Sequence, residues 1–181
     1  MNLQQIGLKY AATENQQFHG DKATTHQGYL KVYERLFGDM KDVRLLEVGV
    51  AAGLSLKMWR EWFGDRATIA GMDISDEWFP AGLTDEFKIH IGASHVPSCR
   101  GFVESFQPNI IIDDGSHDPS IQLATFYNLR SYVQPGGFYV IEDTPNIDSW
   151  RHEFEALGAC DIFDLRASAG RCDNVLVVYP T

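Results

Sequence analysis

The stretch "LLEVGVAAGLSLKMW", residues 45–59, combines a strand, a tight turn and a helix in immediate succession. Its first residues are apolar and typical of a buried strand. Leu56 and Trp59 at its end, with Phe63 just beyond it, recur at the spacing of one helical face. Two glycines and small residues join the two halves. A strand that passes through a glycine turn into a helix is typical of an α/β domain.

The same alternation continues along the chain. Seven short apolar segments, rich in β-branched or aromatic residues, predict buried strands. They cover residues 44–50, 68–74, 87–93, 109–115, 136–144, 160–167 and 174–181. The first five are predicted to be parallel, and a short turn between the last two favours an antiparallel pair. We therefore expect a Rossmann-like α/β fold, with a seven-stranded, mostly parallel sheet and helices on both faces.

Helical periodicity separates several of these strands. A helix is predicted over 26–38, and Gly38 is suited to end it in the left-handed conformation. A second helix, over 118–133, is predicted to begin with Asp118 as its N-cap. A third is predicted over 149–158.

Length and charge limit the classes of protein to consider. The chain has 181 residues, which suits one domain, and we expect a leader or lid segment over 1–25 before a core over 26–181. It carries 25 acidic and 15 basic side chains, so its field repels phosphate backbones and anionic membranes. Nucleic acid and membrane are therefore poor candidates as partners.

Cysteine usage and hydropathy predict the compartment. The three cysteines are far apart and fit neither a metal knuckle nor a disulfide framework, which favours reduced thiols in a cytoplasmic protein. No apolar run reaches the roughly 18 residues that span a bilayer, and the start lacks the pattern of an export signal. We expect a soluble protein that is not exported.

The glycine turn departs from the dinucleotide-binding fingerprint. That fingerprint is G-x-G-x-x-G, because a diphosphate must approach backbone N–H groups, but the chain has Gly49-Val50-Ala51-Ala52-Gly53. The turn fits E-x-G-x-A-x-G, and the Glu47 carboxylate favours a ligand with a cationic amino-acid end. Asp73 ends the second strand, where a carboxylate can accept hydrogen bonds from both ribose hydroxyls. A nucleoside that carries an amino acid is S-adenosylmethionine.

The predicted cofactor site combines this turn with the ends of the second, third and fourth strands. At the end of the third strand, main-chain and short polar groups can hold adenine. The candidate cofactor-binding residues are Glu47, Gly49, Ala51, Gly53, Asp73, Ile74, Ala93, Ser94 and Asp113. The alternative is an ordinary tight turn followed by a strand-end carboxylate.

Two pairs of carboxylates follow neighbouring predicted strands, Asp113-Asp114 and Glu142-Asp143. Adjacent strands lie about 4.8 Å apart, and ligands bind outside their carboxyl ends, so the two pairs can meet. Crowded carboxylates favour a hard divalent cation such as Mg²⁺. Because side chains alternate along a strand, we assign Asp114, Glu142 and Asp143 to the metal and Asp113 to the cofactor side. The alternative is a loop cap beside a solvated strand end.

His117 lies on the predicted loop just beyond these carboxylates. An imidazole in this place is a candidate general base. Methyl transfer from a sulfonium is an in-line displacement, and an alcohol attacks well only after its proton leaves. Metal coordination lowers the pKa of the hydroxyl, and the imidazole can accept the proton. The set therefore predicts O-methylation with His117 as the catalytic residue.

Four segments together resemble the macrocin and mycinamicin sugar O-methyltransferases. They are "LLEVGVAAGLSLKMWREWF", "IAGMDI", "IIIDDGSH" and "PGGFYVIEDT", and the resemblance covers roughly residues 20–145. It implies a class I methyltransferase fold and an enzyme that depends on S-adenosylmethionine and Mg²⁺. It also implies that the metal is held by Asp114, Glu142 and Asp143, with His117 as the base.

The segment "HGDKATTHQGYLKVYERLF", residues 19–37, resembles the part of these enzymes that precedes the first strand. The resemblance places Lys22, His26 and Tyr29 in a pocket-lining stretch. The alternative is an ordinary amphipathic helix with a polar leader.

These observations predict an O-methyltransferase that uses S-adenosylmethionine and Mg²⁺, or another hard divalent cation, to methylate a hydroxyl of a small molecule. A sugar or another natural product is the expected acceptor. The chain is shorter than the sugar enzymes, which argues against a macrolide-bound sugar as substrate but not against the cofactor. A homo-oligomer is compatible with the sequence. Two alternatives are a metal-dependent hydroxylase or hydrolase that uses the same carboxylates, and a non-catalytic module that binds S-adenosylmethionine.

Overall fold

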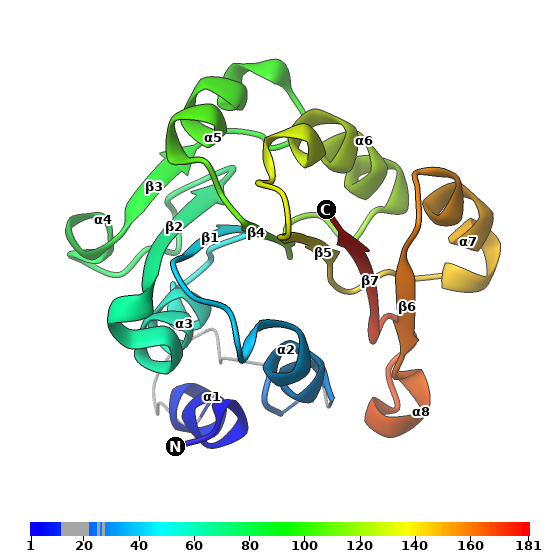
Figure 1. The fold of residues 1–181 in the computed structure, drawn as a ribbon, viewed down its shortest axis with the longest axis horizontal. Coiled ribbons are helices and arrows are strands. Elements are labelled where there is room, and N and C mark those ends of the chain that lie inside the picture. The colour runs from blue at the N-terminus through cyan, green and yellow to red at the C-terminus, as the bar shows by residue number, and fades with distance from the viewer. Residues whose placement is uncertain (12–21, 25, 27) are drawn as a thin grey trace.

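A single sheet runs through the centre of the molecule (Figure 1). The computed structural model describes residues 1–11, 22–24, 26 and 28–181. Its strands are β1 (Val43–Val48), β2 (Ala67–Asp73), β3 (Lys88–Ile91), β4 (Ile110–Asp113), β5 (Phe138–Ile141), β6 (Asp161–Asp164) and β7 (Val175–Pro180). Their order is β3-β2-β1-β4-β5-β7-β6, and β7 is antiparallel to both of its neighbours. The predicted seven-stranded, mostly parallel sheet is confirmed.

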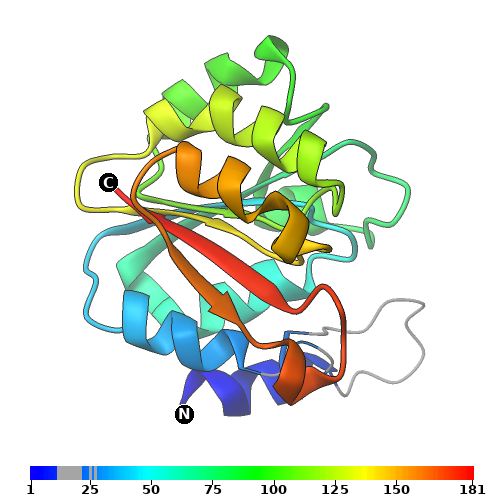
Figure 2. The same ribbon diagram turned by 90° about the vertical axis from the view of Figure 1, so that its right-hand side faces the viewer.

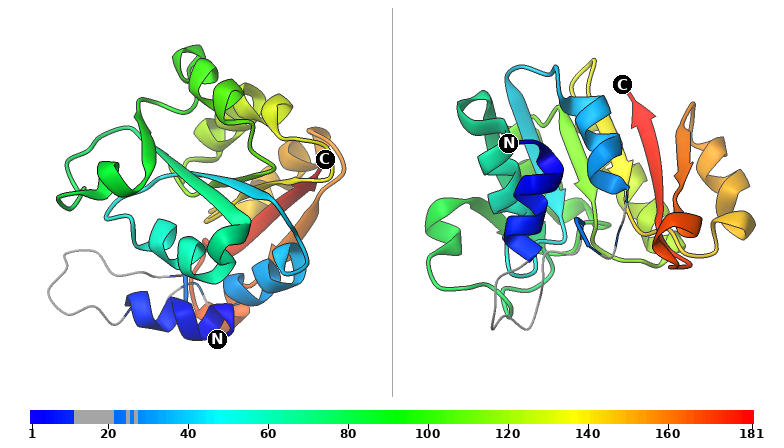
Figure 3. Two further views of the ribbon diagram at one scale, coloured as in Figure 1. Left: turned by 60° about the vertical axis from the view of Figure 1, so that its left-hand side comes forward. Right: turned by 90° about the horizontal axis from the view of Figure 1, so that it is seen from below.

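Helices cover both faces of this sheet. They are α1 (Leu3–Ala11), α2 (Tyr29–Phe37), α3 (Leu54–Phe63), α4 (Leu83–Glu86), α5 (Arg100–Phe106), α6 (Pro119–Leu129), α7 (Ile147–Ala156) and α8 (Arg166–Ala169). Figures 1 and 2 show α1, α2 and α3 on one side of the sheet and α5, α6 and α7 on the other. Figure 3 shows α1 beside α2 and α3. In the described ranges, no helix is long and apolar enough to cross a membrane.

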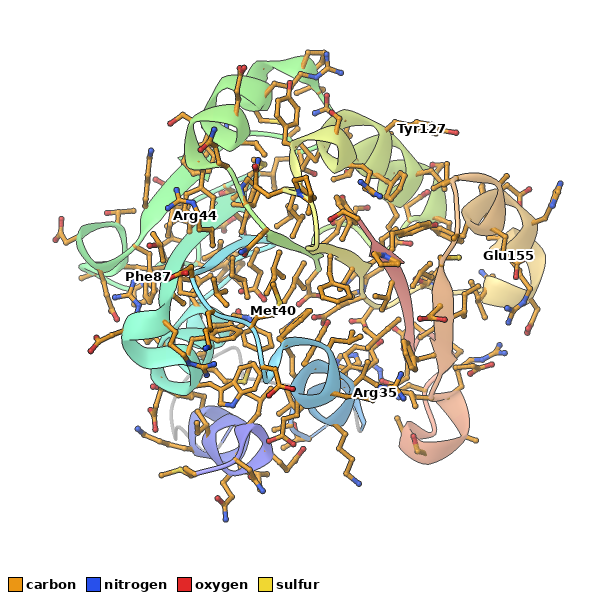
Figure 4. All side chains as sticks on the ribbon, viewed as in Figure 1. Arg35, Met40, Arg44, Phe87, Tyr127 and Glu155 are labelled. Carbon is orange, nitrogen blue, oxygen red and sulfur yellow. The ribbon has the colours of Figure 1, made fainter. Side chains whose placement is uncertain are left out.

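Two apolar layers hold the helices to the sheet, because side chains alternate between its faces. Leu45 of β1 packs with Tyr33 and Trp59 on the side of α2 and α3. Its neighbour Leu46 packs on the opposite side, in the same cluster as Phe126 of α6. Figure 4 shows side chains filling the space between the sheet and both helical layers.

Helix ends follow the sequence in one case and depart from it in another. The Asp118 side chain accepts a hydrogen bond from the Ser120 amide at 2.8 Å, so the predicted N-cap of α6 is confirmed. Gly38, by contrast, has φ −56° and not the predicted left-handed conformation. Its amide still donates to the Glu34 carbonyl, so the helical pattern simply continues to this residue. Residues 3–11, expected to belong to a leader or lid, form α1.

The sheet reverses its winding direction between β1 and β4. β1 pairs with β2 on one side and with β4 on the other, in parallel in both cases. In open α/β sheets, ligands bind outside the carboxyl ends of the strands at such a switch point. The fold therefore directs attention to the segments that follow β1, β4 and β5.

Candidate active site

A cavity of about 530 Å³ lies at the carboxyl ends of β1, β2, β3 and β4, within the usual size range for small-molecule sites. Six of the nine predicted cofactor residues line it: Gly49, Ala51, Asp73, Ile74, Ala93 and Ser94. Further lining residues include Tyr10 of α1, Trp78 and His95, which the sequence did not identify. The ends of four predicted strands thus meet at one cavity.

The glycine turn after β1 is held by a carboxylate of β2. Asp73 Oδ2 accepts hydrogen bonds from the amides of Val50 and Ala51 at 2.7 and 3.0 Å. Gly49 has φ +88°, and a Cβ at this residue would run into the main-chain carbonyl of Asp114. Ala51 also has a positive φ, which is uncommon for a residue with a side chain. The turn is therefore a constrained backbone that brings β1 against the end of β4.

Glu47 does not line the cavity. Its side chain is buried, and Oε2 accepts a hydrogen bond from the Ser55 hydroxyl at 2.5 Å. The Lys22 ammonium lies 3.5 Å from Oε1, so a cation of the chain itself occupies the place that the sequence suggested for a ligand ammonium. Burial raises the pKa of Glu47 to about 6. Gly53 also lies outside the cavity lining, and a Cβ there would contact Leu83.

Asp113 faces away from the predicted cofactor side. The alternation of β4 places it on the face of α5 and α6, where its Oδ2 accepts a hydrogen bond from the Tyr139 hydroxyl at 3.1 Å. It is buried and not among the residues that line the cavity, and burial raises its pKa to about 7. The two neighbouring aspartates do point in different directions, but only Asp114 reaches the cavity.

Asp114 and Glu142 share the ammonium group of Lys22. The Lys22 Nζ lies 2.6 Å from Asp114 Oδ2 and 2.7 Å from Glu142 Oε2. The second oxygen of Glu142 accepts a hydrogen bond from the Tyr33 hydroxyl at 2.5 Å. Burial raises the pKa of Glu142, and Lys22 offsets part of this shift. Glu142 is therefore enclosed by partners from the segment that precedes β1.

Asp143 follows at once and has different partners. Its Oδ1 accepts a hydrogen bond from the Tyr29 hydroxyl at 2.8 Å, and its Oδ2 lies 3.1 Å from His26 Nε2. The half-exposed His117 places Nε2 3.6 Å from Asp143 Oδ2 and 3.5 Å from Asp114 Oδ1. The hydrogen bond with Asp114 raises the pKa of His117. The predicted base therefore lies between two of the predicted metal ligands.

One group of these side chains has the geometry to hold a divalent ion. Asp114, His117 and Asp143 each offer one ligand atom, all within 4.8 Å of one another. The structure groups Asp114 and Asp143 with His117, whereas the prediction grouped them with Glu142. Two carboxylates fit a hard ion that completes its shell with water. The imidazole nitrogen near them could serve as a ligand or as a base, but one lone pair cannot do both at once.

Residues just before α2 and within it supply most of the partners of this acidic cluster. Lys22, His26, Tyr29 and Tyr33 recur at intervals of four, three and four residues, and each contacts a strand-end carboxylate. The resemblance singled out the first three without a role. The helical spacing of polar groups in an otherwise apolar face is the signal that could have identified all four.

Comparisons with known proteins identify relatives of this chain. 8-Demethyl-8-alpha-L-rhamnosyl tetracenomycin-C 2'-O-methyltransferase from Streptomyces olivaceus is 33% identical over 138 residues, which are 69% of this chain and 35% of that protein. Demethylmacrocin O-methyltransferase from Streptomyces fradiae is 36% identical over 124 residues, or 61% of this chain and 30% of that protein. The chain thus spans about a third of the length of the curated relatives it matches. No family model matches it.

Solved structures agree with these relatives. MycE methyltransferase from the mycinamycin biosynthetic pathway, in complex with Mg, SAH and mycinamycin VI, has 29% identity and a TM-score of 0.60, and the match covers 79% of this chain and 37% of that one. Fibrillarin from Aeropyrum pernix, in complex with S-adenosyl-L-methionine, shares the fold at 18% identity and a TM-score of 0.57, over 76% of this chain and 66% of that one. The predicted class I methyltransferase fold is confirmed.

Proposed function

We propose that this chain, a homologue of sugar O-methyltransferases with the class I methyltransferase fold, transfers a methyl group from S-adenosylmethionine to a hydroxyl of a small molecule. In this proposal residues 1–181 form one methyltransferase domain. The observation that carries it is the position of Asp114, which lines the large cavity and also belongs to the group able to hold a divalent ion. A cofactor in the cavity and an acceptor at the acidic cluster would therefore be neighbours.

The cavity supplies the features that this cofactor requires. The turn after β1 lines the cavity with Gly49, Val50, Ala51 and Ala52, none of which has a long or charged side chain. Asp73 lies at the cavity edge as a partner for ribose hydroxyls. Ala93 and Ser94 line the region after β3 that we assign to adenine. The complexes of MycE with SAH support this assignment by homology.

The acidic cluster would bind and activate the acceptor. Asp114 and Asp143, with water, would hold Mg²⁺, which when bound lowers the pKa of an acceptor hydroxyl. His117, half-exposed between them, would accept the hydroxyl proton if it is not itself a ligand. The acidic cluster would also orient the hydroxyl oxygen for in-line attack on the methyl group. A sugar or a related natural product with vicinal hydroxyls suits such a site, and the macrolide in the MycE complex supports this class of acceptor.

Calorimetric titration tests the cofactor assignment. We expect SAH to bind the wild-type chain and to bind Asp73→Asn at least roughly tenfold more weakly, a loss of about 1.4 kcal/mol. The matched control is Asp76→Asn, because Asp76 is exposed and does not line the cavity. Absence of SAH binding to the wild-type chain would refute the proposal.

Transfer of a labelled methyl group from S-adenosylmethionine to small sugars and diols, with and without Mg²⁺, tests the reaction. Loss of transfer in both Asp114→Ala and His117→Ala, with SAH binding retained, is the expected result. If SAH binds but no acceptor is methylated, the non-catalytic module is favoured. Hydrolysis or hydroxylation of the same compounds would favour the metal-dependent alternative.

A further inference from the structure

A buried lysine lies at the centre of the acidic cluster. The Lys22 side chain comes from the segment before α2 and is only 4% exposed. Its Nζ lies 2.6 Å from Asp114, 2.7 Å from Glu142 and 3.5 Å from Glu47. These carboxylates follow β4 and β5 or belong to β1, so one ammonium group links three neighbouring strands.

The three carboxylates need a cation for a simple electrostatic reason. Glu47 and Glu142 are almost completely buried, and a buried carboxylate without compensation is strongly destabilising. An ammonium group has three N–H donors and no acceptor, which suits three carboxylates arranged around it. The geometry at Lys22 meets this need without any ion.

The contacts of Lys22 also give the carboxylates different roles in the cluster. Glu142 is committed on both oxygens, one to Lys22 and the other to Tyr33. Asp114 uses Oδ2 for Lys22, while its Oδ1 faces His117 on the side of Asp143. The pairing thus separates a lysine-bound half of the cluster from the half that has ion-binding geometry.

We propose that Lys22 is a tethered internal cation, a positioning residue that neutralises Glu47, Asp114 and Glu142 and assembles the acidic cluster before a divalent ion binds beside it. The inference deepens the proposed function, on which it rests only for the identity of the neighbouring ion site. It implies that the fold of the cluster does not depend on metal. It also implies that an added ion could replace the ammonium if the lysine were removed.

Thermal unfolding in EDTA tests the first implication. Because removing one partner leaves buried carboxylates without their cation, Lys22→Met should lower the Tm by roughly 10 °C. Lys22→Arg should recover part of this loss. The matched control is Lys57→Met, because Lys57 lies 4.0 Å from Glu86 at a partly exposed position and a surface pair contributes little. We expect its Tm to change by no more than about 2 °C.

A double variant and an added ion test the second implication. Lys22→Met combined with Glu142→Gln should unfold at a higher temperature than Lys22→Met alone, because one unpaired charge is gone. Saturating Mn²⁺ should raise the Tm of Lys22→Met by more than it raises that of the wild type, and the double variant should lose this extra gain. If Lys22→Met does not fold, recovery of folding in the double variant is the expected result.

Two outcomes would overturn the proposal. One is a Lys22→Met variant that unfolds in EDTA at the wild-type temperature, and the other is a double variant that is no more stable than the single one. Neither measurement uses a methyl acceptor or S-adenosylmethionine. A failure of this inference is therefore distinguishable from a failure of the proposed methyl transfer, which SAH titration and the transfer assay report.

Discussion

At the scale of single residues, burial decides the chemistry of the carboxylates. Glu47, Asp113 and Glu142 are all almost fully buried, and for each of them burial is the largest cause of a raised pKa. Their partners are lysine, serine or tyrosine side chains from other elements. The sequence identified these carboxylates as functional candidates. It could not show that they lie outside the cavity lining, whereas Asp114 reaches it.

Glu47→Gln tests this effect of burial through pH. The folded-state pKa of Glu47, about 6, is above its ordinary value of 4.5, so the folded chain binds the proton more tightly than the unfolded chain. The contribution of Glu47 to the free energy of unfolding should therefore fall by about 2 kcal/mol as pH rises through this window, and this contribution should stay level above it. The glutamine variant lacks this term. Urea unfolding at pH 4, 5 and 7 gives the difference in the free energy of unfolding between Glu47→Gln and the wild type. This difference should shift in favour of the glutamine variant as pH rises. A difference that does not change with pH would contradict the raised pKa.

Gly49→Ala tests the constrained turn, with Gly136→Ala as its matched control. Both glycines have a positive φ, but a Cβ at residue 49 would run into the Asp114 carbonyl, whereas nothing lies within 4 Å of one at residue 136. The backbone strain alone should cost about 1 kcal/mol in each variant. The steric clash should bring the loss for Gly49→Ala to about 3 kcal/mol, as measured by urea unfolding. Equal losses would mean that the turn relaxes freely.

The sequence predicted the residues of this turn better than those of the acidic cluster. Gly49 and Asp73 belong to a local pattern with a known backbone requirement, and both line the cavity. Lys22 and Glu142 are 120 positions apart and meet only in the folded chain. Their pairing depends on packing of the segment before α2 against the sheet, which no local pattern specifies.

At the scale of elements, the pattern of apolar residues was sufficient to predict helices with one buried face and strands that are completely buried. Strands β4 and β5 lie within the predicted segments and are shorter than predicted, because the chain leaves the sheet at the polar residues that follow them. Strands β1 and β2 begin one residue before their predicted segments, at Val43 and Ala67. The pattern did not predict α1 or α5. α5 has only seven residues, and α1 has only nine and is stabilised by its packing against α2 and α3.

The loop after β3 depends on one side chain of α6. Asn128 donates hydrogen bonds to the carbonyls of Ser94 and Val96 at 2.7 and 2.8 Å and accepts one from Arg100 at 2.6 Å. Because Ser94 lines the cavity, Asn128 connects two helices of one layer to the proposed adenine site.

Asn128→Ala should therefore lower the free energy of unfolding by about 2 kcal/mol, because it leaves two partly buried carbonyls without their donor. It should also weaken SAH binding roughly tenfold, as measured by calorimetry. The control is Tyr127→Ala on the same helix, since Tyr127 is 72% exposed and points outward (Figure 4). Equal affinities for SAH in both variants would show that the loop is held in another way.

At the scale of the whole molecule, the strand order places the proposed cofactor cavity and the acidic cluster at one edge of the sheet. β1 and β4 lie at the centre, and the segments after them contribute Gly49 and Asp114. The cavity is thus built from loops that the central strands hold in place. A ligand bound there should stabilise the entire fold, because unfolding of the sheet would dismantle its site.

Cysteine labelling measures this coupling. Cys99 is completely buried, its Sγ lies 3.1 Å from the Val96 carbonyl below the proposed adenine loop, and burial raises its pKa. Cys172 is exposed.

A thiol reagent should label Cys172 quickly with or without SAH, whereas Cys99 should react only when the fold opens. SAH at a hundred times its Kd should slow labelling of Cys99 about 100-fold, the equivalent of 2.7 kcal/mol, if that opening also destroys the cofactor site. Peptide mass spectrometry separates the two thiols. An unchanged rate at Cys99 would mean that the segment just before α5 opens without disturbing the cavity, and the loop after β3 would then not be part of the bound site.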